Sequence, residues 1–135
     1  MLLLSDIKDW IKTLGIGENF YTGKLDNKKE KSIGIYQRPS YDKAEIAIGG
    51  LKNTKTRSKQ ISILIHWSKY SGETEGAAQR LYDAIAATEN LEIAGKHVDF
   101  IKLDMPEPAD VGTDDAGVYE RVIWLTLYYQ ERKDA

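Results

Sequence analysis

The sequence of 135 residues contains no cysteine. Without thiols the chain has no disulfide framework, no thiolate zinc site, no iron–sulfur cluster and no cysteine nucleophile. Folding needs none of these, because a chain of this length buries roughly two thirds of its unfolded surface. The length predicts one domain spanning residues 1–135.

Net charge and long apolar runs are also lacking. The formal net charge is -2, from 19 Lys and Arg against 21 Asp and Glu. Such a chain has no global field for a nucleic-acid backbone, which argues against a dedicated polyanion binder. The longest apolar run, Val122 to Tyr129, is interrupted by Thr126 and is far shorter than the roughly 20 residues that span a bilayer. We therefore expect no membrane partner.

Hydrophobic periodicity predicts two helices, at residues 3–14 and 71–88. Strands are predicted at 19–24, 32–38, 59–67, 91–93, 96–104 and 118–131. We expect 19–24 to pair with 32–38 as a hairpin, and 91–93 with 96–104. Flexible loops are expected at about 40–58 and 105–117, with a frayed tail at 132–135. The fold class is α+β, with a single mostly antiparallel sheet and two helices packed on one face.

No motif points firmly to catalysis. Gly15-Ile16-Gly17 follows a helix rather than a strand, so it predicts a helix cap and turn instead of a nucleotide loop. His66, His97 and Asp99 could share one sheet face as a metal or ligand site, but solvent-side or interface histidines explain them as well. The resulting alternative function is a small α+β ligand-binding domain or enzyme.

Two segments of opposite charge bracket the central strand and helix. Residues 52–59 hold cations and no acid, whereas 104–115 hold acids and no base. The candidate subunit-interface residues are Lys52, Lys55, Arg57, Lys59, Asp104, Glu107, Asp110, Asp114 and Asp115. Both segments could be solvated loops. Alternatively, the basic loop of one copy contacts the acidic loop of the next, a head-to-tail contact that can close into a ring. The basic loop could also touch passing DNA without reading its sequence.

The order of the predicted elements and several short segments together form a recognisable layout. These segments are the helix 3–14, Ile33-Gly34-Ile35-Tyr36 leading to Arg38-Pro39, the strand 60–65, the helix segment 77–85, Ile93-Ala94-Gly95 and the closing strand 119–129. In this layout the chain resembles the minor capsid or tail-completion proteins of the tail terminator group, found in long-tailed bacteriophages and prophages. The resemblance covers nearly the whole chain.

The resemblance implies a structural role in the virion. Such proteins form a hexameric ring at the head-proximal end of the tail tube, end tube polymerisation and present a surface to the head connector. The implied partners are further copies of the chain, the major tail tube protein and a head-completion protein. It also implies no cofactor, no catalysis, and a location in the tail or neck after assembly in the host bacterial cytoplasm. A neighbouring head-completion protein of the same neck is an alternative.

Overall fold

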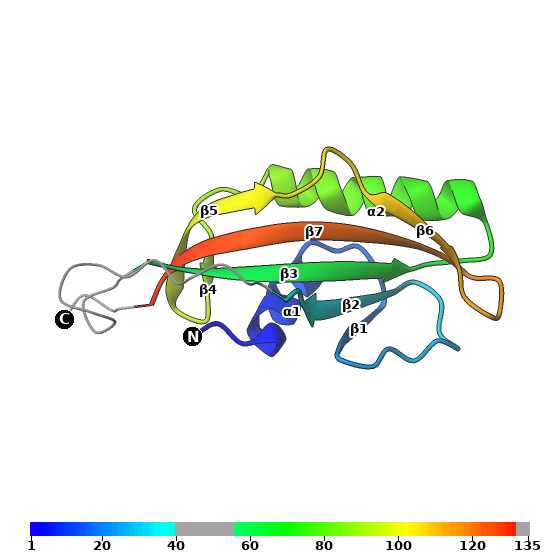
Figure 1. Cartoon of the computed structure of the whole chain (residues 1–135), viewed down its shortest axis with the longest axis horizontal. Coiled ribbons are helices and arrows are strands. Elements are labelled where there is room, and N and C mark those ends of the chain that lie inside the picture. The colour runs from blue at the N-terminus through cyan, green and yellow to red at the C-terminus, as the bar shows by residue number, and fades with distance from the viewer. Residues whose placement is uncertain (40–55, 132–135) are drawn as a thin grey trace.

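The computed structural model of the chain describes residues 1–39 and 56–131 (Figure 1). Within these residues, two helices accompany the strands of one sheet. In chain order the elements are α1 (Leu4–Thr13), β1 (Asn19–Thr22), β2 (Ser32–Gln37), β3 (Thr56–His66), α2 (Ser71–Ala86), β4 (Glu92–Ile93), β5 (Lys96–Leu103), β6 (Ala109–Thr113) and β7 (Tyr119–Gln130). The α+β class predicted from the sequence is confirmed.

The sheet is centred on its two longest strands, β3 and β7, which pair antiparallel along the whole of β3. The strand order is β1-β2-β3-β7-β5-β4, and β6 pairs with the part of β7 that precedes its pairing with β5. All pairs are antiparallel except β1 with β2. The sheet is therefore mixed, although antiparallel pairs dominate as predicted.

Strand alternation gives the sheet an inner face, against which both helices pack. Ile61, Ile63 and Ile65 of β3 are fully buried there, and alternate residues of β7 lie beside them. The other main members of this core cluster are Ile7, Ile11, Ile33, Ile35, Ala77, Ala78, Leu81, Ile85, Ile123, Leu125 and Leu127. One cluster holds residues from both helices, so the prediction of two helices on one face is confirmed. Burying each large aliphatic side chain contributes about 1.5–3 kcal/mol.

The predicted hairpin between 19–24 and 32–38 is wrong, because β1 runs parallel to β2. The N–H groups of Glu18 and Asn19 both donate to the Lys31 carbonyl, at 2.8 and 3.3 Å, which sets Asn19 opposite Ser32. Segment 23–31, at ~3.3 Å per residue, is long enough to return to the start of β1 before β2 begins. A connection of this length allows β2 to run parallel to β1, whereas a tight turn would make the two strands antiparallel.

Two predicted loop boundaries are corrected as well. The expected loop 105–117 contains β6, because β7 extends beyond β5 and Ala109–Thr113 pairs with the remaining part. The expected loop 40–58 ends earlier than predicted, because β3 begins at Thr56 and pairs with Gln130 there. Residues 40–55 and the predicted tail 132–135 lie outside the described residues.

Candidate functional site

The face of the sheet opposite the helices carries exposed and partly exposed side chains of several strands. We call it the outer face and define it by alternate side chains of the three strands β3, β7 and β5, which the strand pairing sets side by side. These residues are Ser58, Gln60, Ser62, Leu64, Val122, Trp124, Thr126, Tyr128, Phe100 and Lys102. Only Lys102 among them is charged, although 30% of the chain is charged. Depletion of charge is typical of the centre of a protein interface.

An arginine from the neighbouring strand end is fixed against this face. Arg38 Nη2 lies 2.6 Å from Asp104 Oδ2 and 3.4 Å from Thr126 Oγ1, and the Thr126 hydroxyl donates to the same carboxylate oxygen at 2.8 Å. The Arg38 guanidinium carbon lies 5.0 Å from the centre of the Trp124 ring, within cation–π range. This cluster holds the arginine and the tryptophan in one orientation.

Aromatic side chains give the outer face its apolar area. Trp124 is 44% exposed and Phe100 is 58% exposed, while the rings of Phe100 and Tyr128 lie 5.9 Å apart. Tyr36 lies across Gly34 on β2, where a Cβ atom at position 34 would come within 2.7 Å of the ring. Burial raises the pKa of Tyr36, the nearby Glu120 charge raises it further, and a hydrogen bond to the backbone of Leu25 opposes both. Tryptophan, tyrosine and arginine are the residues most often found at interface hot spots.

The structure changes the environment of the basic candidate residues. Arg57 and Lys59 lie within β3, on the residues that alternate with the outer face, and not in a loop. The Lys59 ammonium donates to the Leu2 carbonyl at 2.7 Å, and Arg57 stands opposite Tyr129 of β7. The other two basic candidates, Lys52 and Lys55, lie outside the described residues. A basic-loop interface, or a DNA contact of this segment, stays a prediction.

The acidic candidates divide into paired and exposed groups. Asp104 is held by Arg38, and Asp110 Oδ2 lies 3.7 Å from Arg121 Nη2. Asp114 closes a turn by accepting from the N–H groups of residues 116 and 118. Glu107 and Asp115 are exposed and make no ion pair with another residue that the structure describes. These last two therefore keep their charge available for a partner.

His66 is fully buried at one end of β3 and joins three segments. Its Nδ1 lies 2.9 Å from Glu120 Oε2 on β7 and 3.7 Å from Asp114 Oδ2. Its Nε2 lies 3.1 Å from the Asn27 carbonyl, which can only accept, so this nitrogen donates. His66 therefore ties the turn after β1 to β7, and Asp114 of the turn after β6 lies beside it.

The hypothetical grouping of His66, His97 and Asp99 does not form. His66 stands opposite Glu120 on β7, whereas Val98, next to His97, stands opposite Tyr129. That separation along β7 is about 30 Å. His97 Nε2 lies 3.5 Å from Asp99 Oδ1, with both side chains exposed. Within residues 1–39 and 56–131, no three His, Cys, Asp or Glu side chains come together as a metal site.

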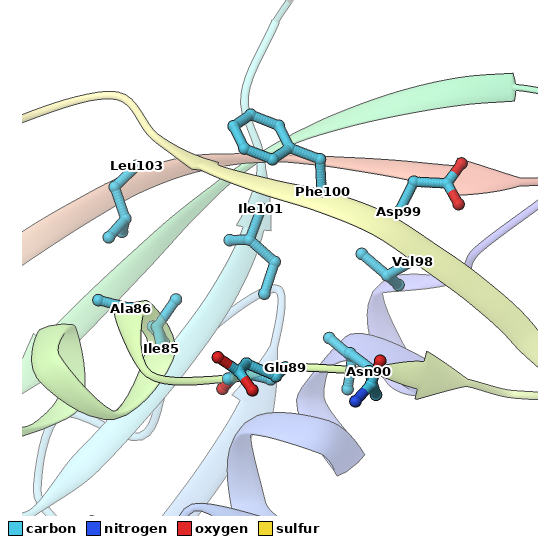
Figure 2. A pocket seen from close by; sticks show the side chains of 11 residues that line it. Ile85, Ala86, Glu89, Asn90, Val98, Asp99, Phe100, Ile101 and Leu103 are labelled. Carbon is cyan, nitrogen blue, oxygen red and sulfur yellow. The ribbon is translucent and has the colours of Figure 1, made fainter.

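An open cavity of about 430 Å³ lies between the C-terminal end of α2 and β5 (Figure 2). Its lining combines the apolar side chains of Ile85, Ile101 and Leu103 with the polar residues Thr88, Asn90 and Asp99. A second acid, Glu89, also lines it. The alternative function, a small ligand-binding domain or enzyme, needed a polar pocket around His66, His97 and Asp99. Of these three residues, Asp99 lines this cavity and the two histidines do not.

These features define a class. The fold presents a sheet face that carries exposed aromatic side chains and an Arg38–Asp104 ion pair. Exposed aromatic residues and a fixed arginine are typical of a protein interface, so these features indicate an interaction protein. Neither described helix has the length and apolarity needed to cross a membrane.

The comparison with protein families makes the class specific. A family model described as Bacteriophage tail terminator protein matches residues 4–131, so the chain belongs to this family. A search of curated proteins gave no match. The resemblance derived from the sequence is confirmed, and the chain is a structural protein of phage tail assembly whose place is the virion. The family is one of structural tail proteins and not of enzymes.

Sequence reasoning missed the outer face as a site. Trp124 and Tyr128 lie on this face, and the residues that alternate with them on β7 form a buried set on the inner face. The signal was the run of even-numbered residues on β7, which combines aromatic and uncharged polar side chains. The pairing of Arg38 with Asp104, 66 positions apart, left no sequence signal.

Proposed function

We propose that this protein acts as the terminator of the tail tube. Copies of the chain assemble into a ring on the head-proximal end of the tube, end its polymerisation and provide the surface to which the head joins. The family match over residues 4–131 carries this proposal. The partners are further copies of the chain, the major tail tube protein and a head-completion protein.

The chemistry of the outer face supports a role in docking. Its centre combines exposed aromatic area with a fixed arginine and little net charge, as expected for the centre of an interface. A ring component needs at least two kinds of contact, one with its neighbours in the ring and one with the tube or head. We assign the outer face to contact with the tube or head, and leave the sheet edges for contact between copies.

Electron microscopy of tails tests the proposal. Tails are prepared from a phage or prophage lacking this gene, with the protein supplied from a plasmid or withheld. With the protein, tubes should have one length and carry a ring at one end. Without it, tubes should be uncapped and variable in length, and should not join heads.

Two outcomes would overturn the proposal. Tubes of uniform length that join heads without this chain would exclude a terminator. A chain found only on the head, with no contact to the tube, would instead make it a head-completion protein.

A further inference from the structure

We propose that the strand β6 of one copy pairs antiparallel with β1 of the next copy, so that the sheets of neighbouring subunits become continuous. This inference rests on the proposed ring and names the surfaces that build it. The partner is a second copy of this chain.

Both strands are sheet edges. Among the residues that the structure describes, β1 pairs with β2 alone and β6 pairs with β7 alone. In Figure 1 they lie on opposite sides of the sheet, with β2, β3 and β7 between them. An edge strand offers unpaired N–H and C=O groups that can accept another strand. One chain therefore presents two different edges, as a head-to-tail contact requires.

The two edges occupy the same level along the strands. The pairings connect Asn19 through Ser32, His66 and Glu120 to Gly112. In the same way, Tyr21 is connected through Gly34, Leu64 and Val122 to Ala109. A neighbour can therefore join its β6 to β1 with little shift along the strand axis. A contact without such a shift closes into a ring, whereas a shifted contact builds a helical filament.

Strand direction also suits this pairing. β1 runs parallel to β2, and each further step across β3, β7 and β6 reverses direction. Consequently β6 runs opposite to β1. A neighbour that keeps its inner face on the same side pairs antiparallel, which is the more stable arrangement per residue.

The charges beside the two edges are complementary. The turn 24–31 after β1 carries four lysines against the two exposed acids Asp26 and Glu30, so its net charge is positive. Its exposed Lys24, Lys28 and Lys29 make no ion pair with a described residue. Beside β6, Glu107 and Asp115 are exposed and equally unpaired among the described residues. His66 lies between the two turns: its Nε2 is hydrogen-bonded to the Asn27 carbonyl, and its Nδ1 lies 3.7 Å from Asp114 Oδ2. Opposite charge across the contact sets its register and disfavours pairing of like edges.

Disulfide cross-linking tests the contact directly, because the chain has no cysteine of its own. The double variant Tyr21→Cys/Ala109→Cys is oxidised as purified protein at rising concentration, and also within tails assembled from the tail genes of its phage. Non-reducing electrophoresis should show a ladder of linked chains ending at the ring size. Each single variant should give at most a dimer. The matched control Tyr21→Cys/Lys102→Cys, with the second thiol on the outer face, should give no ladder.

Charge exchange supplies a second readout. Lys28→Glu should raise the protein concentration needed for ring formation at least tenfold. Adding Asp115→Lys should return this concentration to that of the unmodified protein. Lys96→Glu makes the same charge change at the far end of the sheet, and should have no such effect.

Failure of this inference is distinguishable from failure of the proposed function. If tails are capped normally but no ladder forms in either preparation, the edge contact is wrong and the terminator role stands. A disulfide between position 21 or 109 and the tube protein would assign the edge to the tube instead, and would overturn self-pairing. If tubes remain uncapped with the unmodified protein, the terminator role itself fails.

Discussion

Adjacent residues of the same strands point to opposite faces of the sheet, and the two faces differ in the kinds of side chain they carry. On β3, Ile61, Ile63 and Ile65 are fully buried, whereas Ser62 and Leu64 between them are partly exposed on the outer face. The inner face is aliphatic and covered by both helices, while the outer face is polar and aromatic and holds its few charges around the Arg38–Asp104 pair. The inner face thus supplies stability, and the outer face remains available for other molecules.

The largest expected effect distinguishes the two faces within one strand. Ile63→Ala leaves a cavity in the core and should lower the free energy of unfolding by about 3–4 kcal/mol. Leu64→Ala, on the next residue, should lower it by about 1 kcal/mol, because the side chain is only partly buried. Urea denaturation followed by circular dichroism measures both. Equal losses would contradict the division into faces.

His66 is the exception that sharpens the comparison. It stands on the outer-face alternation of β3 but is fully buried. His66→Ala removes the partner of the Glu120 carboxylate and the Asn27 carbonyl, and should cost about 2–3 kcal/mol. The other histidine provides the control, since His97→Ala changes an exposed side chain and should cost less than about 0.5 kcal/mol. Denaturation curves of the two variants decide the point.

Trp124 should separate assembly from stability. Trp124→Ala should lower the stability of the isolated protein by about 1 kcal/mol or less, since the ring is 44% exposed. If the outer face docks, the same change should weaken binding to tail tubes by about 2 kcal/mol, roughly 30-fold. Sedimentation with uncapped tubes measures this binding. Ser58→Ala, on the same face, is the matched control. Equal binding by the two variants would show that Trp124 is not part of the docking surface.

The smallest effect concerns pH and the inner face. Burial raises the pKa of Tyr129, and the nearby Glu131 charge adds to this, while the hydrogen bond from the Leu2 N–H and the Arg57 charge oppose it. Because the folded pKa lies above the unfolded value of about 10, the stabilisation is present below pH 10 and lost as the pH rises through the folded pKa. Tyr129→Phe should therefore flatten the fall in stability between pH 9 and pH 11. An unchanged slope would contradict this role of Tyr129.

Periodicity predicted much of the fold, because burial imposes it directly on the sequence. The helix stripe that includes Ile7 and Ile11 and the alternation of Ile61, Ile63 and Ile65 both gave correct elements. Strand partners were harder, because pairing depends on where long connections return. The parallel course of β1 follows from the Lys31 carbonyl, which accepts from two backbone N–H groups near β1.

The strand β6 shows a second limit of sequence reasoning. All five of its residues are exposed, and its sequence Ala-Asp-Val-Gly-Thr has weak strand propensity. It is a strand because β7 is long enough to need a second partner along one edge. The acidic segment could be seen in the sequence. Its pairing with Arg38 and Arg121 could not, because that pairing depends on which strands lie side by side.

The long pairing of β3 with β7 has a mechanical consequence. All eleven residues of β3 are paired with β7, so the two strands overlap along the whole length of β3. A pull along the strands loads many hydrogen bonds at once, in shear, whereas a pull across them would peel the bonds apart one after another. If this chain transmits tension along the strand axis within a phage tail, β3 and β7 would therefore separate only when the hydrogen bonds between them break together.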